Sequence, residues 1–232
     1  MTDNLPLPAN RLQTVLTRIH DACEAAGRDA AAITLLAVSK TRSSDELRAM
    51  AALGVRCFGE NYLQEGLQKI EVLADLGLEW HFIGPIQSNK TKPLAENFDW
   101  VHSVDRLKIA QRLSRQRPEK LPPLNLCLQV NVSGEQSKSG VTLAQLPGLA
   151  HEVATLPKVR LRGLMAIPAP VGGFDKQRLP FRKMREALEQ LNRDGLQLDT
   201  LSMGMSGDLE AAIAEGATIV RIGTALFGAR KG

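Results

Sequence analysis

Short apolar runs alternate with longer amphipathic stretches along most of the chain. The apolar runs are rich in β-branched and aromatic residues and predict strands at Thr34–Ser39, Arg56–Gly59, Trp80–Gly84, Trp100–Val104, Asn125–Val132, Leu161–Ile167, Thr200–Met203 and Thr218–Ile222. The intervening stretches carry apolar residues at helical spacing and predict helices at Pro8–Ala26, Ser44–Leu53, Leu63–Leu76, Asp105–Gln116, Leu143–Leu156, Phe181–Asp194 and Gly207–Glu215. This alternation is typical of β-α units that form a mostly parallel sheet.

Eight strand-helix units in 232 residues predict an α/β fold, a single (β/α)8 barrel of the TIM type with an extra N-terminal helix. We expect residues 1–232 to form one domain, because no Ser/Gly-rich or low-complexity linker divides them. A Rossmann sheet is the alternative. It would usually place a G-x-G-x-x-G turn after the first strand, whereas residues 39–44 read SKTRSS.

Composition places the chain among ordinary globular proteins. Hydrophobic residues make up 44% and charged residues 23%, which argues against disordered, collagen-like and coiled-coil architectures. The longest apolar run, Ala30–Val38, is about half the length of a membrane-spanning helix, and the first ten residues lack the features of a signal peptide. We therefore predict a cytoplasmic protein without a membrane partner. The cysteines Cys23, Cys57 and Cys127 form no C-x-x-C pair, so we expect neither a disulfide framework nor a metal site.

The net charge of +4 raises the question of nucleic-acid binding. Aromatic residues make up only 4% of the chain, and the basic stretches Arg112–Lys120 and Arg178–Arg185 have helical spacing and acidic neighbours. Solvated helix faces account for these stretches better than a nucleic-acid interface does. We predict no nucleic-acid partner.

In a (β/α)8 barrel, functional residues gather at the C-terminal ends of the strands. Lys40 directly follows the first predicted strand. Its ammonium group could simply reach solvent, as most lysine side chains do. Partial burial at the barrel mouth would instead suit the amine to a Schiff base with an aldehyde.

The loops after the seventh and eighth strands commonly bind phosphate in this fold. Ser206 and Gly207 open a predicted helix, where Ser206 would either cap the helix or help its free amides to bind an anion. Strand alternation places Arg221 on the face shared by Ile219 and Gly223. If that face lines the barrel interior, the guanidinium needs an acceptor, which a structural salt bridge or a bound phosphate would supply.

Gly223 and Thr224 could offer amides and a hydroxyl to the same phosphate that Ser206 and Gly207 approach. A lysine facing such a cradle matches the chemistry of pyridoxal 5′-phosphate (PLP). The aldehyde of this cofactor would meet the amine, while its phosphate would meet the cradle.

Longer stretches of the sequence extend this interpretation. The chain resembles the pyridoxal phosphate homeostasis protein family, small relatives of the alanine racemase N-terminal barrel, in the stretches LLAVSKTRSSDELR, CFGENYLQEGLQKI, WHFIGPIQSNKTK, NVSGEQSKSG, GLMAIPAP and LSMGMSGDLEAAIAEGATIVRIGTALFG. The resemblance implies that Lys40 carries PLP as an internal aldimine. It also implies that the phosphate is held by Ser206, Gly207, Gly223 and Thr224, and that the ring is surrounded by Asn61, His81, Met165, Met203 and Arg221.

The same resemblance bears on catalysis. A guanidinium at Arg221 facing the pyridine nitrogen would disfavour its protonation and make the ring a poor electron sink. Racemisation needs a second acid-base group, which the alanine racemase family takes from a tyrosine of a separate C-terminal domain. We expect that domain to be absent, and we expect Tyr62 to be a packing or pocket-wall residue. His81 is either a replacement base or a hydrogen-bonded structural histidine, and Lys138 is either a second amine for cofactor exchange or an exposed loop lysine.

We therefore predict a monomeric PLP carrier that acts in intracellular vitamin B6 homeostasis without catalytic turnover and supplies PLP-dependent apoenzymes. Two alternatives stay open. One is a PLP-dependent amino-acid racemase or related α-carbon enzyme with Lys40 as one base. The other is a phosphate-sugar enzyme on the same barrel that uses no cofactor.

Overall fold

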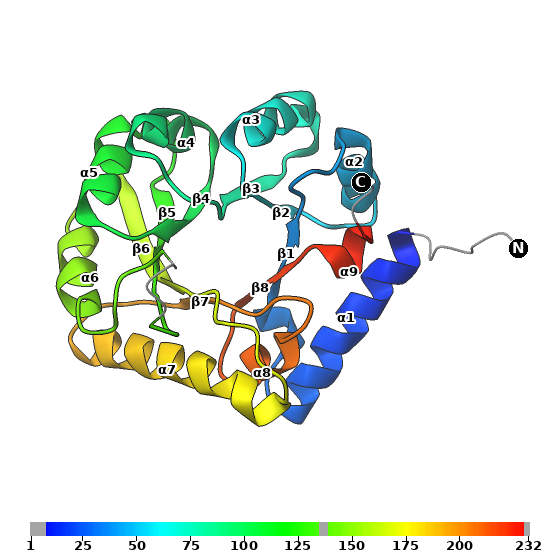
Figure 1. Cartoon of the computed structure of the whole chain (residues 1–232). Helices are drawn as coiled ribbons and strands as arrows, with labels where there is room; N and C mark the ends of the chain where they lie inside the picture. The colour runs from blue at the N-terminus through cyan, green and yellow to red at the C-terminus, as the bar shows by residue number, and fades with distance from the viewer. Residues whose placement is uncertain (1–7, 135–138, 230–232) are drawn as a thin grey trace, which may run out of the picture.

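The computed structural model describes residues 8–134 and 139–229 of the chain. Eight parallel strands follow one another around a closed barrel, and the helices surround it (Figure 1). The strands are β1 (Thr34–Val38), β2 (Cys57–Glu60), β3 (Glu79–Phe82), β4 (Trp100–Val104), β5 (Leu124–Gln129), β6 (Val159–Met165), β7 (Thr200–Ser202) and β8 (Ile219–Ile222). The predicted (β/α)8 barrel is confirmed, and the Rossmann alternative is wrong.

The helices form the outer layer of the barrel, and all except the first and the last connect successive strands. They are α1 (Pro8–Ala25), α2 (Ser44–Ala52), α3 (Leu63–Val72), α4 (Thr91–Asn97), α5 (Leu107–Gln116), α6 (Leu146–Ala154), α7 (Phe174–Arg193), α8 (Leu209–Ala214) and α9 (Thr224–Phe227), with short 3-10 turns at Ala30–Ala32, Ala74–Leu76 and Ser88–Lys90. No helix within the described residues is long and apolar enough to cross a membrane.

Strand alternation divides the core into two apolar clusters. The larger one fills the space between the sheet and the helices and includes Phe58 and Leu126. The smaller one fills the barrel interior and consists of Leu36, Ile83, Trp100, Cys127, Met165 and Ile219. A residue that follows a strand and keeps its inward-facing alternation therefore lies at the carboxyl end of the barrel interior.

Four helices differ from the predictions. Helices α4 and α9 were not predicted, because both are too short to show a helical period. Helix α7 begins at Phe174 instead of Phe181, because the chain continues its helix through Pro180. The predicted start of α8 at Gly207 is also wrong, since a turn precedes Leu209.

The basic stretches are more than solvated helix faces. Arg117 is buried and donates hydrogen bonds to the carbonyls of Ala95 and Phe98, both at 2.8 Å. The buried carboxylate of Glu215 forms ion pairs with three arginines of α7, namely Arg178, Arg182 and Arg185. Part of the positive charge thus fixes helices to the barrel.

Candidate functional site

The carboxyl ends of the strands surround a pocket of about 310 Å³. This volume lies at the lower end of the range for small-molecule sites, which is roughly 300–1,000 Å³. The pocket is lined by Val38, Lys40, Asn61, Ile83, Ile167, Met205, Ser206, Gly207, Arg221, Gly223 and Thr224. The structure therefore brings together seven of the ten predicted site residues, and the other three, His81, Met165 and Met203, are buried outside the lining.

Lys40 lies just beyond the end of β1, on the inward-facing side of the chain. Leu36 fills the barrel interior and Val38 lines the pocket, so alternation directs Lys40 toward the pocket as well. Ser39 lies between these positions, faces the helices and is fully buried. Thr41 follows with φ of 63°, a left-handed conformation that is unfavourable for a β-branched residue. Surrounding contacts must hold this turn in place.

A buried ammonium group supplies several of these contacts. Lys69 of α3 donates a hydrogen bond of 2.7 Å to the carbonyl oxygen of Ser39. It also pairs with Glu60 at 2.8 Å and with Glu65 at 2.6 Å. The Ser39 hydroxyl donates to Glu60 at 2.6 Å. The backbone before Lys40 is thus tied to both β2 and α3.

The same cluster fixes the backbone after Lys40. Glu65 accepts a hydrogen bond of 2.5 Å from the backbone N–H of Thr41, which offsets its left-handed conformation. Burial raises the pKa of Glu60, and the hydrogen bonds from Lys69 and Ser39 counteract that effect. Sequence reasoning missed this cluster, although Glu65 and Lys69 stand at the spacing of neighbours on one helix face.

Asn61 follows β2 and lines the pocket. Its Oδ1 atom is buried and has no hydrogen-bond partner among the described residues. Gly84 lies directly against its backbone, since a Cβ atom at this position would be 2.0 Å from the Asn61 carbonyl oxygen. Only glycine fits at position 84, so this contact fixes the backbone of Asn61. The Oδ1 atom of Asn61 is therefore held beside the pocket as a hydrogen-bond acceptor that no described residue uses.

The turn between β7 and α8 places Ser206 and Gly207 on the pocket lining. The N-cap residue of α8 is Asp208, so the predicted capping role of Ser206 is wrong. The Asp208 carboxylate accepts a hydrogen bond of 2.6 Å from the backbone N–H of Met205, which closes the turn. Gly223 and Thr224 line the pocket from the next strand of the barrel, where they begin α9.

Arg221 lies on the inward face of β8 and is only 4% exposed. Its guanidinium donates to the carbonyl oxygen of Ser202, to the Ser202 hydroxyl at 2.8 Å and to the carbonyl oxygen of Ala166 at 2.8 Å. Burial lowers the pKa of Arg221 to about 10. These acceptors are uncharged, so the salt bridge that was one of the two alternatives for Arg221 is not found within the described residues.

His81 lies deeper in the barrel than the pocket. Its Nε2 atom is 2.7 Å from a carboxylate oxygen of Glu79, and its Nδ1 atom is 2.9 Å from Nε2 of His102. Its ring stacks on Trp100 with centroids 5.4 Å apart. Both ring nitrogens therefore have partners below the pocket, as the hydrogen-bonded structural interpretation of His81 requires. His102 was not singled out from the sequence.

The remaining predicted residues have different surroundings. Met165 belongs to the interior cluster below the pocket, whereas Met203 packs in the larger cluster between sheet and helices. Tyr62 is 56% exposed and lines a neighbouring surface cavity beside Asn61, so it is not a packing residue. Lys138 lies outside the described residues.

Comparison with known proteins decides the family. The family model described as the alanine racemase N-terminal domain matches residues 16–231. A pyridoxal phosphate homeostasis protein of Pseudomonas aeruginosa is 65% identical over 222 residues, covering 96% of this chain and 95% of that protein. The chain belongs to the pyridoxal phosphate homeostasis protein family. A member of this family from Escherichia coli is 54% identical over 225 residues, covering 96% of both chains.

Two solved structures have a similar fold. PipY of Synechococcus elongatus, solved with PLP bound, is similar with a TM-score of 0.82 and 37% identity, covering 96% of this chain and all of that one. The alanine racemase of Corynebacterium glutamicum has a TM-score of 0.64 at 18% identity and shares the fold. That match includes 95% of this chain but only 62% of the racemase.

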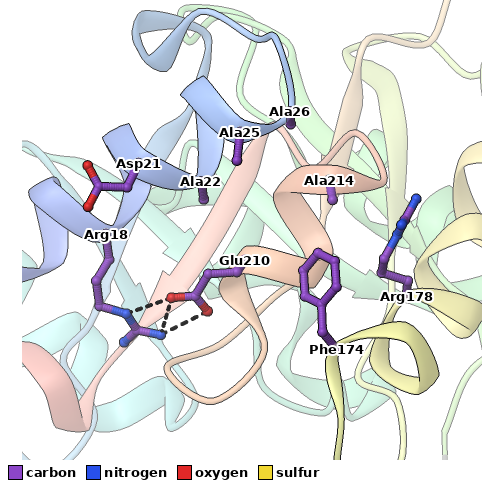
Figure 2. Close-up of a pocket in the computed structure, with 9 residues that line it drawn as sticks. All are labelled: Arg18, Asp21, Ala22, Ala25, Ala26, Phe174, Arg178, Glu210 and Ala214. Carbon is purple, nitrogen blue, oxygen red and sulfur yellow. Dashed lines mark hydrogen bonds and ion pairs between the residues drawn. The ribbon is translucent and has the colours of Figure 1, made fainter.

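A larger cavity of about 590 Å³ lies outside the barrel of this family member, between α1, α7 and α8 (Figure 2). Alanine side chains form much of its wall. An ion pair between Arg18 and Glu210, at 2.7 Å, and a cation-π contact between Arg178 and Phe174 border it. Within the described part of the chain, no lysine, cysteine or serine lines this cavity, so it lacks a nucleophile comparable to Lys40 there.

Potential metal ligands approach one another in two places within the described residues. His20, Asp21 and Glu24 are fully exposed on α1. Cys57, Glu79 and His81 lie at the amino end of the barrel, where the carboxylate is already bonded to the imidazole. Burial and the neighbouring carboxylate raise the pKa of Cys57 to about 12, which disfavours the thiolate that a metal requires. The absence of a metal stays a prediction.

Proposed function

We propose that this chain binds PLP in the pocket around Lys40 and acts as a cytoplasmic carrier in vitamin B6 homeostasis. Its relatives in two bacteria are named pyridoxal phosphate homeostasis proteins, and PipY has been solved with PLP. We further propose that the carrier is a monomer and delivers its cargo to PLP-dependent apoenzymes.

One observation carries the proposal. Lys40 and the loops after β7 and β8 line the same pocket, although about 165 residues separate Lys40 from Ser206 along the chain. The residues also fit the cofactor chemically. The pocket has an amine for an aldehyde, cationic and hydroxyl donors for a phosphate and a ring, and at Asn61 a buried acceptor without a partner among the described residues.

When bound, PLP would supply a reactive aldehyde, and Lys40 is the residue whose amine would hold that end of the cofactor. The remaining roles belong to the chain. Ser206, Gly207, Gly223 and Thr224 would hold the phosphate at the side of β7 and β8. Arg221 would approach the ring from the barrel interior, with His81 and Met165 supporting the site from below and Met203 packing behind the sheet.

The lining favours a carrier over a racemase. Racemisation requires acid-base groups on both faces of the substrate carbon. Among the described residues, no histidine or tyrosine lines the pocket, and Lys40 is its only amine. Both ring nitrogens of His81 have partners away from the pocket. A permanently charged guanidinium near the ring would also weaken the ring as an electron sink.

The absorption spectrum of the purified chain, recorded with PLP before and after borohydride reduction, tests the proposal. We expect a near-visible band that disappears on reduction and leaves a pyridoxyl mass on the peptide that contains Lys40. Lys40→Ala should lose the band. Lys92→Ala, at a side chain that is 68% exposed in an ion pair with Glu96, is the matched control and should keep it.

A colourless protein that gains no band with added PLP would contradict the proposal and favour the phosphate-sugar enzyme. A reduced label on another residue would contradict the role of Lys40. Turnover that incorporates solvent deuterium at the α-carbon of alanine would overturn the carrier function and favour the racemase.

A further inference from the structure

A chain of hydrogen bonds crosses the barrel interior from its amino end to Arg221. Glu79 lies 2.7 Å from His81, and His81 lies 2.9 Å from His102. His102 of β4 lies 2.8 Å from the hydroxyl of Ser202 of β7, on a strand that is not its neighbour in the barrel. That hydroxyl accepts from the Arg221 guanidinium at 2.8 Å. This series of hydrogen bonds links the half-exposed carboxylate of Glu79 to Arg221 in the pocket.

The donors along this chain can be assigned from its two ends. The hydrogen bond from His81 lowers the pKa of Glu79, so Glu79 is a carboxylate and can only accept. Nε2 of His81 must then carry the proton. The donor between the two rings follows from the Arg221 end. The Ser202 hydroxyl accepts from Arg221, and its own hydrogen has Nδ1 of His102 within reach at 2.8 Å, so this Nδ1 accepts and Nε2 of His102 donates to Nδ1 of His81.

The same reasoning continues to Arg221. Burial holds the pKa of His102 well below its usual value, so this ring is neutral and its Nδ1 atom must accept. The Ser202 hydroxyl therefore donates to His102 and accepts from Arg221 with its oxygen lone pairs. Every hydrogen bond points from Arg221 toward Glu79, and each intermediate group donates once and accepts once.

We propose that His81, His102 and Ser202 are positioning residues that use the charge of Glu79 to orient and stabilise the Arg221 guanidinium toward the ring end of the pocket. Arg221 is buried and its acceptors are uncharged. The carboxylate of Glu79 polarises one of them, the Ser202 hydroxyl, through the successive hydrogen bonds of His81 and His102. This inference rests on the proposed binding of PLP, because the ring of PLP is the group that Arg221 would meet.

The cofactor-free protein provides the first test. Nitrogen-15 NMR of the histidine rings at pH 7.5 should show both His81 and His102 protonated at Nε2 and unprotonated at Nδ1. Ser202→Ala should shift the Nδ1 resonance of His102, because it removes the donor to that atom. A His102 ring protonated at Nδ1 would reverse the donor and acceptor roles along the hydrogen bonds. That result would overturn the inference, whether or not PLP binds.

The second test measures PLP binding by the absorption band of the loaded protein. We expect Ser202→Ala to weaken binding about tenfold, the effect of losing one hydrogen bond to a charged group. Glu79→Gln keeps an acceptor oxygen for His81 but removes the charge, and should weaken binding by a smaller factor, about threefold. Glu79 is half-exposed, so this variant should fold.

Ser114→Ala is the matched control, since its buried hydroxyl donates to the Pro157 carbonyl away from the chain, and it should bind PLP like the wild type. Wild-type affinity in both Ser202→Ala and Glu79→Gln would overturn the inference while leaving PLP binding established. A wild-type protein without a band would instead refute the proposed function, and the NMR test would still decide the direction of the chain.

Discussion

At the scale of single residues, strand alternation decides which side chains reach the pocket. It predicts the inward direction of Lys40 and Arg221 from the sequence, because each follows apolar residues at every second position. It does not predict that His102 and Ser202 touch. Their contact joins strands on different sides of the barrel, so it depends on register and barrel closure, which one sequence does not specify.

A glycine controls the position of Asn61. We expect Gly84→Ala to destabilise the protein by about 1–3 kcal/mol, because the new methyl group would collide with backbone that must move. It should also weaken PLP binding by displacing Asn61. Thermal unfolding and PLP titration would measure both effects.

The control is Gly148→Ala on α6, where a Cβ atom would meet nothing within 4 Å. This substitution should stabilise the helix, by up to about 1 kcal/mol. Equal stability of the two variants would show that the contact between Gly84 and Asn61 is not the constraint that the geometry indicates.

At the scale of elements, α3 and β2 act together on the end of β1. The turn after Lys40 combines a left-handed Thr41 with a buried ion cluster, and neither is visible as a motif in SKTRSS. The sequence does predict α3, since its apolar spacing is regular. The long-range role of Lys69 could not be predicted because it depends on how α3 packs against the sheet.

The ion cluster should be sensitive to the loss of one partner. We expect Lys69→Met to cost about 3–5 kcal/mol of unfolding free energy at pH 7, because it leaves the Glu60 carboxylate buried without its cation. The double variant Lys69→Met/Glu60→Gln should recover part of that loss. Denaturant unfolding would measure it, and an additive double variant would contradict the coupling.

Acid should partly rescue Lys69→Met. The pKa of Glu60 is already raised by burial, and without the cation it rises further above its unfolded value. The destabilisation is then largest above the folded pKa and shrinks as the pH falls toward about 4.5, the ordinary value for glutamate. Arg48→Met, which breaks an exposed ion pair with Asp75, is the control and should have a much smaller effect without this rescue.

At the scale of the whole molecule, a neutral histidine in the barrel interior links stability to pH. The pKa of His102 is held below its usual value by burial and by the nearby Arg221 guanidinium. Below about pH 6.5 the unfolded chain takes up a proton at His102 that the folded chain does not, so acid favours unfolding. The slope for one proton is about 1.4 kcal/mol per pH unit.

We therefore expect the unfolding free energy of the wild type to fall more steeply between pH 6.5 and 5 than that of His102→Gln, because glutamine does not titrate at this position. Chemical denaturation across this range would compare the two slopes directly. Carboxylates contribute to both proteins alike, so they cancel in the difference. Equal slopes would mean that His102 also takes up a proton in the folded state.

Helix α1 packs along α8 and α9 and connects the two ends of the described chain (Figure 1). Arg11 donates to the Phe227 carbonyl at 2.9 Å, and Leu12 and Val15 are buried. The family match begins at residue 16, inside this helix. A fragment that began at that residue would lose the first two turns of α1, and with them the hydrogen bond from Arg11 that holds α9, the helix that begins with Thr224 of the pocket.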